Sequence, residues 1–220
     1  MAGRVAIFDW DGVVVDSSAA HKQAWQRLAA AEGLPIHPDS FLRGFGKRNE
    51  VIIPEIHGWS RDPAEIHRLS LAKEAYYRDL ATGGLISLLP GAKELLRALK
   101  QAGIPCVIGT STHRLNLRLA FDRFDLESFF QGAVTSEDVT RGKPDPEVFL
   151  KACALIQGDV GQSAVFEDTL AGVAAAKAGG FRAVGLCTTN SREVMATSGA
   201  DLIVANLSEV TPELALPKAR

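Results

Sequence analysis

Two aspartates that follow a short apolar run are the residues of this chain best placed to do chemistry. The run VAIF at 5–8 is typical of a buried strand, and Asp9 and Asp11 come directly after it. In an extended backbone, residues i and i+2 point to the same side, so the two carboxylates are expected to converge. Carboxylates this close repel each other unless a cation lies between them or one carries a proton. The pair therefore indicates a functional site.

Three further polar clusters also follow apolar runs. They are Thr110-Ser111-Thr112, Lys143 just before Pro144, and Glu167-Asp168. Hydroxyls and loop amides suit phosphate oxygens, a lysine can neutralise an anion, and several carboxylates suit a hard cation such as Mg²⁺. Each cluster alone is more often a helix start, a turn or a solvated loop. Together they indicate a phosphate held beside Mg²⁺.

Strand and helix patterns alternate along most of the chain and would position these clusters. Strand-like runs lie at 5–8, 104–109, 132–134, 164–166, 183–186 and 202–204, and helical patterns at 92–101, 115–121, 146–156, 170–178 and 192–197. This alternation predicts a parallel sheet covered by helices on both faces. Ligands bind such sheets at the carboxyl ends of the strands, where the polar clusters are expected to lie.

The segment from about residue 18 to residue 88 breaks the alternation. It shows helical patterns at 20–31 and 64–80 and no convincing strand. Asp62-Pro63 suits a helix start, and Gly83-Gly84 allows a flexible return to the sheet. We interpret this segment as a helical insertion that acts as a lid over the site. The alternative is that its helices pack onto the sheet as part of one body.

Composition excludes several classes of partner. The net charge is −2 and the pI near 6.2, so no basic surface favours nucleic acid or an anionic membrane. No apolar stretch approaches the roughly 18 residues of a membrane span, and the N-terminus does not resemble a signal peptide. The cysteines at 106, 153 and 187 are widely spaced and odd in number, which predicts buried thiols in a reducing compartment. We therefore expect a cytoplasmic protein; the oligomeric state is left open.

The polar motifs resemble, in order and spacing, those of the haloacid dehalogenase superfamily of phosphotransferases. They read Asp9-x-Asp11-Gly12-Val13-x-x-Asp16-Ser17, Thr110, Lys143-Pro144-x-Pro146 and Glu167-Asp168-x-x-x-Gly172. His21-x-x-Ala24-Trp25 and Gly44-Phe45-Gly46 resemble the β-phosphoglucomutase and phosphoglycolate phosphatase branch. The resemblance implies an α/β fold: a Rossmann-like three-layer core with a parallel sheet (1–17 and 88–220) and a small α-helical cap domain inserted after the first strand (18–87).

The resemblance also implies a role for each catalytic residue. Asp9 would attack phosphorus and become an aspartyl phosphate, and Asp11 would protonate the leaving oxygen and then activate water. Thr110, with Ser111 nearby, would hydrogen-bond a phosphoryl oxygen. Lys143 would balance charge between the phosphoryl group and Asp9. Such an arrangement suits phosphoryl transfer, which needs positioning and charge neutralisation above all.

Metal and substrate residues follow from the same resemblance. Asp9, Asp168 and the backbone carbonyl of Asp11 would hold Mg²⁺, with Glu167 as a ligand or directly behind the ligands. Substrate or phosphate would be bound by Gly12, Thr110, Ser111, Lys143, His21, Lys47, Arg48 and Asn49. His21 also has a simpler interpretation as a cap-helix residue near the hinge.

The motifs leave more than one function open. Dehalogenation needs neither an acid at position 11 nor Mg²⁺, so the presence of Asp11 and Glu167-Asp168 argues against it. A sugar phosphomutase would need a cap cation for a second phosphate; Lys47 falls where the resembling mutases carry arginine, and Arg48 is one place along. A non-catalytic binding protein is disfavoured because every motif residue is present. We expect a Mg²⁺-dependent phosphatase acting on a small phosphorylated metabolite, a sugar phosphate or a short organic-acid phosphate.

Overall fold

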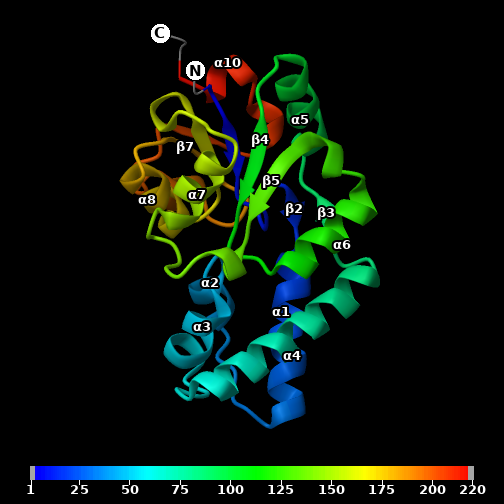
Figure 1. Ribbon diagram of the computed structural model, residues 1–220. Helices are drawn as coiled ribbons and strands as arrows, with labels where there is room; N and C mark the ends of the chain where they lie inside the picture. Colours follow the sequence, from blue (N-terminus) through cyan, green and yellow to red (C-terminus); the bar gives the residue numbers. More distant parts are fainter. Residues whose placement is uncertain (1–2, 218–220) are drawn as a thin grey trace.

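A six-stranded parallel sheet forms the centre of the molecule (Figure 1). The computed structural model describes residues 3–217. In spatial order the strands are β5 (Phe130–Val134), β4 (Cys106–Gly109), β1 (Ala6–Phe8), β6 (Ala164–Glu167), β7 (Arg182–Leu186) and β8 (Leu202–Val204). From β1 the chain first adds β4 and β5 on one side of the sheet. It then returns and adds β6, β7 and β8 on the other side. The switch point beside β1 is where such sheets bind ligands.

Helices cover both faces of the sheet because side chains alternate along each strand. Phe8 and Phe166 belong to one apolar core and Ile7 and Val165 to the other. The first core lies under α5 (Ala92–Gln101), α6 (Arg114–Phe124) and α10 (Pro212–Ala215), and the second under α7 (Glu147–Leu155), α8 (Leu170–Ala178) and α9 (Arg192–Met195). The sheet and its two helical layers confirm the predicted α/β, Rossmann-like class.

Residues 18–87, which we call the helical segment, lie below the carboxyl ends of the strands in Figure 1. The segment contains α1 (Ser18–Glu32), α2 (Ser40–Gly44), α3 (Asn49–Val51), a π-helical turn (Ile52–His57) and α4 (Pro63–Thr82). Helices α1 and α4 pack together, and Trp25, Leu28, Ile53 and Leu69 are among the residues of a separate small core. The Asp62 side chain accepts a hydrogen bond from the N–H of Ala64, which fixes the start of α4.

Most element boundaries agree with the sequence patterns, and the exceptions are short. Strands β2 (Val15–Asp16) and β3 (Ser87–Leu88) form an antiparallel pair where the chain leaves and re-enters the sheet region. A strand of two residues is too short to show an alternating pattern, so the pairing of β2 with β3 was not predicted. Cys106 and Cys153 are buried as expected, but Cys187, just beyond β7, is partly exposed. Over residues 3–217, no helix is long and apolar enough to cross a membrane.

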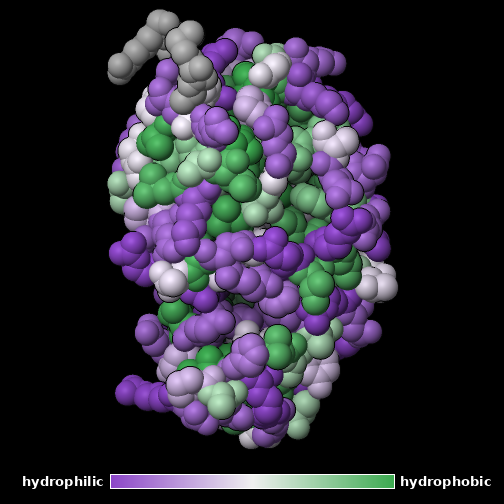
Figure 2. All heavy atoms as spheres, in the orientation of Figure 1, coloured by the Kyte–Doolittle hydropathy of each residue, from purple (hydrophilic) through white to green (hydrophobic). Residues whose placement is uncertain are grey.

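The surface is mixed in character. Figure 2 shows hydrophobic residues among polar ones over the region of β4, β5 and α7, whereas hydrophilic residues cover most of the helical segment. A band of hydrophilic residues also runs across the junction between the sheet region and the helical segment on this face. The surface at this junction is therefore polar on this side.

Candidate active site

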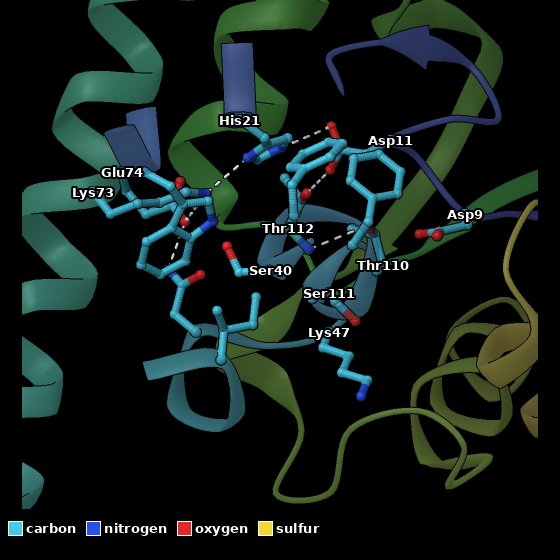
Figure 3. A pocket seen from close by; sticks show the side chains of 17 residues that line it. Asp9, Asp11, His21, Ser40, Lys47, Lys73, Glu74, Thr110, Ser111 and Thr112 are labelled. Carbon is cyan, nitrogen blue, oxygen red and sulfur yellow. Dashed lines mark hydrogen bonds and ion pairs between the residues drawn. The ribbon is translucent and has the colours of Figure 1, made fainter. Parts of the chain in front are cut away.

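Two of the polar clusters line a pocket between the carboxyl ends of the strands and the helical segment (Figure 3); Lys143, Glu167 and Asp168 lie next to Asp9 without lining it. Asp9, Asp11 and the 110–112 loop line it from the sheet side; His21, Lys47, Asn49, Lys73 and Glu74 line it from the helical segment. In Figure 3, Asp9 lies at one end of the pocket and the Lys73–Glu74 pair at the other. The pocket therefore joins residues more than a hundred positions apart in the sequence.

Lys143 holds Asp9 and Glu167 together at the sheet end of the pocket. Its ammonium lies 2.9 Å from Asp9 Oδ2 and 2.7 Å from Glu167 Oε1, and all three side chains are buried. Burial alone would lower the pKa of Lys143, but the two carboxylates raise it. Burial raises the pKa of Asp9 to about 7; Lys143 opposes this shift, while Glu167 and Asp11 add to it. One lysine thus balances only part of the negative charge gathered here.

The remaining charge is suited to a divalent cation. Asp9, Glu167 and Asp168 each offer a carboxylate oxygen, and these oxygens lie within 4.8 Å of one another. Asp9 Oδ1 and Asp168 Oδ1 are buried, and neither has a hydrogen-bond partner within residues 3–217. Burial and the carboxylates of Glu167 and Asp9 raise the pKa of Asp168 well above its usual range. Two unpartnered buried oxygens beside a third carboxylate fit a hard cation such as Mg²⁺.

The oxygens of Glu167 are already in use. Oε1 accepts from Lys143, and Oε2 accepts from the N–H of Asp168 at 2.8 Å and from the N–H and hydroxyl of Thr169 at 2.7 and 2.9 Å. Although burial opposes it, Lys143 lowers the pKa of Glu167. Glu167 therefore anchors Lys143 and the turn that carries Asp168.

The loop after β7 holds Asp168 in place, a contribution that the sequence analysis missed. The Thr189 hydroxyl donates to Asp168 Oδ2, and the Asn190 side-chain amide donates to the Asp168 carbonyl at 2.9 Å. Thr188 donates to the carbonyl of Gly12, whose φ is +79°. A Cβ on Gly12 would overlap the Asp168 carboxylate, so only glycine fits there. The hydroxyl-rich end of this strand was the signal that could have revealed the loop.

Asp11 faces the same pocket as Asp9 but is held by different partners. Its carboxylate accepts from the Ser17 hydroxyl at 2.5 Å and from the Thr112 hydroxyl, and lies 3.3 Å from His21 Nε2. Burial would raise the pKa of Asp11, but His21 and the two hydroxyls lower it to about 2. The Asp11 side chain is therefore an ionised acceptor, separate from the carboxylate group formed by Asp9, Glu167 and Asp168.

The 110–112 loop lies between the two aspartates. Thr110 is buried, its N–H donates to the Val134 carbonyl, and its hydroxyl accepts from the N–H of Thr112. Ser111 lines the pocket. Gly12 was also expected to bind phosphate, but its N–H donates to the Val15 carbonyl within the turn. The groups on this side that remain available to an anion are therefore those of Thr110 and Ser111, with Lys143 beside Asp9.

A buried charged pair of α4, which the sequence analysis also missed, lies at the far end of the pocket. Lys73 Nζ lies 2.7 Å from His21 Nδ1 and 3.0 Å from Glu74 Oε1. Glu74 also accepts from the side-chain amides of Asn49 at 2.7 Å and Asn116 at 2.5 Å. Burial opposes it, but Lys73 and His21 lower the pKa of Glu74 to about 2. Lys73 shares the buried stripe of α4 with Leu69 and Tyr77, a spacing that could have revealed it.

The predicted substrate residues of the helical segment divide into two groups. His21, Lys47 and Asn49 line the pocket, and Lys47 Nζ forms no hydrogen bond or ion pair with any described residue. Arg48 does not line this pocket; its guanidinium donates to the carbonyl of Thr140 at 3.1 Å. The structure therefore brings together every predicted pocket residue of this segment except Arg48.

Comparison with known proteins agrees with this arrangement. The haloacid dehalogenase-like hydrolase family profile matches residues 4–180, which span most of the chain. The chain belongs to this family. As a haloacid dehalogenase-like hydrolase it is an enzyme, and phosphatases are among its relatives.

Two curated relatives cover nearly the whole chain. One is the validoxylamine A 7′-phosphate phosphatase of Streptomyces hygroscopicus subsp. limoneus, 35% identical over 94% of this chain and 95% of its own length. The other is the β-phosphoglucomutase of Bacillus subtilis, 31% identical over 96% of this chain and 93% of its own. The relatives thus include both a phosphatase and a mutase, as the motif resemblance implied.

The fold is shared with solved structures of the family. A family IA haloacid dehalogenase hydrolase from Entamoeba histolytica superposes with a TM-score of 0.86 at 26% identity, covering 96% of both chains. A hydrolase from Pseudomonas syringae gives a TM-score of 0.84 at 27% identity, covering 93% of this chain and 94% of its own. The likeness extends over both the sheet and the helical segment.

Proposed function

We propose that this haloacid dehalogenase-like hydrolase is a Mg²⁺-dependent phosphatase that acts through an aspartyl phosphate on Asp9. One observation carries the proposal: Asp9 has one oxygen on Lys143 and the other unpartnered, at the end of a pocket bounded by Thr110 and Ser111. A carboxylate that is held by one oxygen and free at the other is arranged to attack phosphorus. The surrounding groups supply the charge neutralisation that phosphoryl transfer needs.

The Mg²⁺ site of this proposal fits the residues present. Asp168 would hold the ion through its unpartnered oxygen and Asp9 through the carboxylate oxygen that does not attack phosphorus, with the backbone carbonyl of Asp11 completing the protein ligands and Glu167 supporting them from behind. When bound, the ion would neutralise negative charge on the phosphoryl oxygens. Thr189 would keep the Asp168 carboxylate turned toward the site.

Asp11 takes the proton-transfer role in this account. Its ionised carboxylate lies in the same pocket as Asp9 and can accept a proton from the water that discharges the aspartyl phosphate. A bound phosphate brings negative charge next to Asp11 and raises its pKa, which favours loading it with the proton needed by the leaving oxygen. Lys143 stays protonated throughout, since two carboxylates hold its ammonium.

We also propose that the helical segment, residues 18–87, is a cap domain that selects the substrate, with residues 1–17 and 88–220 as the core. It has its own apolar core and supplies His21, Lys47 and Asn49 to the pocket. The two-stranded pair β2–β3 lies where the segment joins the core. A cap of this kind would exclude water and contact the part of the substrate beyond its phosphate.

The substrate class we propose is a small phosphate monoester of a sugar or short organic acid. The test is a panel of phosphorylated metabolites scored for phosphate release with and without Mg²⁺. Release from at least one sugar or organic-acid phosphate, lost on chelation and restored by Mg²⁺, is the expected result. Release that is unaffected by chelation, or that persists in Asp9→Asn, would refute the mechanism.

A sugar phosphomutase is the second candidate, and Lys47 is the observation that favours it. Its ammonium lines the pocket without a partner among residues 3–217 and could bind the second phosphate of a bisphosphate intermediate. The discriminating assay follows conversion of β-glucose 1-phosphate to glucose 6-phosphate with a bisphosphate primer. Isomerisation much faster than phosphate release would favour the mutase over the phosphatase.

A further inference from the structure

The Arg48 side chain extends from the helical segment to the core, whereas its neighbours Lys47 and Asn49 line the pocket. Its side chain is 17% exposed, and Nη1 donates to the carbonyl oxygen of Thr140 at 3.1 Å. Arg48 Nε lies 3.4 Å from the carboxylate of Glu50 on the same segment. This contact belongs to the polar junction between the two parts of the molecule.

The loop that receives Arg48 is fixed from the core side. Glu147, the first residue of α7, accepts from the N–H of Thr140 at 3.2 Å, from its hydroxyl at 3.0 Å and from the N–H of Arg141 at 2.9 Å. Lys151 holds the Glu147 carboxylate in turn at 2.6 Å. Because these bonds fix the 140–141 backbone, the Thr140 carbonyl offers Arg48 an acceptor in a defined position.

The same loop carries Lys143, so Arg48 docks next to the catalytic lysine. A Cβ added to Gly142 would lie 3.2 Å from Arg48 Cδ and 3.4 Å from Cγ. The aliphatic part of Arg48 therefore packs against the backbone immediately before Lys143. Arg48 is thus in contact with the residue that precedes Lys143, whose ammonium lies between Asp9 and Glu167.

A second contact between the helical segment and the core lies beside Glu167, which pairs with Lys143. Gly46, with φ +80°, lies so close to the core that an added Cβ would be 2.9 Å from Thr169 Cγ2. Thr169 donates both its N–H and its hydroxyl to Glu167. The stretch 46–48 thus touches the core at two points, one beside Lys143 and one beside Glu167.

We propose that Arg48 is a positioning residue: its docking on Thr140 and Gly142 ties the helical segment to the correct placement of Lys143 against Asp9. Arg48 touches no substrate in this role. The inference rests on the proposed phosphatase function only for its kinetic readout. It adds a link between the helical segment and catalysis that runs through the backbone of the loop carrying Lys143.

The kinetic test compares the parent with Arg48→Met, Arg48→Lys and Arg43→Met, using p-nitrophenyl phosphate with Mg²⁺. Arg48→Met keeps the aliphatic stem and removes the donor; we expect kcat to fall about tenfold, as for one lost charge-assisted hydrogen bond, with KM within about twofold of the parent. Arg48→Lys should recover part of kcat because its ammonium can reach the same carbonyl. The exposed Arg43, which pairs with Asp39 at 3.7 Å, is the charge-matched control and should match the parent.

Three kinetic results would contradict the proposal. A raised KM with unchanged kcat would make Arg48 a substrate contact. Equal kinetics in the parent and Arg48→Met would leave it without a role. A lysine variant as impaired as the methionine variant would show that a cationic donor to the Thr140 carbonyl does not support kcat. Hydrogen exchange supplies a test that needs no activity. We expect faster exchange of the amides at 139–146 in Arg48→Met than in Arg43→Met, and equal exchange would overturn the inference even if no substrate were found.

Discussion

The two sides of the pocket are built in different ways. On the sheet side, Asp9 directly follows β1, Glu167 ends β6 and Lys143 comes from the loop before α7; all three are buried, and Lys143 contacts both carboxylates. On the side of the helical segment, Lys47 is exposed in the turn between α2 and α3, and Asn49 is the first residue of α3. The sheet fixes the first side, whereas the second depends on how a separate helical segment packs. Under the proposed function, the first side carries out the chemistry and the second selects the substrate.

The largest expected effect follows from removing the nucleophile. Asp9→Asn should lower Mg²⁺-dependent phosphate release by about 10⁴-fold or more, because no other group can form the covalent intermediate. Its melting temperature should not fall, since the change removes one of several crowded carboxylates and leaves Lys143 paired with Glu167. Activity assays and thermal melts check this pair of results. Substantial residual turnover in the folded variant would place the nucleophile elsewhere.

Removing the lysine tests how strongly the sheet side depends on charge balance. Lys143→Met leaves Asp9 and Glu167 buried without their cation and should cost about 3–5 kcal/mol of unfolding free energy, together with most of the activity. Lys177→Met, which removes the partly exposed ion pair with Asp201, should cost no more than about 1 kcal/mol. Denaturant titrations of both variants give the comparison. Equal losses of unfolding free energy would show that the buried ion pairs of Lys143 stabilise the fold no more than an exposed ion pair does.

The loop that supports Asp168 should affect metal affinity more than fold. Thr189→Val removes the hydroxyl that orients the carboxylate and should weaken Mg²⁺ binding about 10–100-fold. Calorimetric titration of Mg²⁺ measures this without substrate. Thr197→Val, which loses only a bond to the Val194 carbonyl, is the control. An unchanged dissociation constant for Thr189→Val would mean that Asp168 needs no such support.

The smallest effect is expected at Lys47, on the side of the pocket formed by the helical segment. Lys47→Met should raise KM for the preferred sugar or organic-acid phosphate several-fold, because it removes one exposed cation facing the substrate. Hydrolysis of p-nitrophenyl phosphate should stay close to that of the parent. Lys22→Met removes an exposed lysine of α1 outside the pocket and serves as the control. An equal loss of activity on both substrates would assign Lys47 to the chemistry. The two sides of the pocket would then not differ in role.

The sequence was informative where strands end. Asp9, Thr110, Lys143 and Asp168 could be placed together because apolar runs predicted a parallel sheet, and the carboxyl ends of its strands meet at one edge. The direction of each side chain was not predictable by this rule. Asp11, expected beside Asp9, is turned to Ser17, His21 and Thr112 instead.

The helical segment was less readable because its side chains are oriented by tertiary packing. Lys47, Arg48 and Asn49 are consecutive, yet Arg48 alone leaves the pocket, since the fold places the Thr140 carbonyl within its reach. No periodic pattern distinguishes these neighbours. Lys73 could have been recognised as a charge on a buried helix stripe, whereas its bond to His21 depends on how α1 and α4 pack.

The most direct test of the central claim is to identify the residue that carries the phosphoryl group during turnover. Borohydride added to the working enzyme reduces an acyl phosphate, and peptide mass spectrometry then locates the product. The account predicts conversion of Asp9 to homoserine, dependent on substrate and Mg²⁺ and absent without either. Reduction at another carboxylate, or full turnover with no trapped residue, would contradict it.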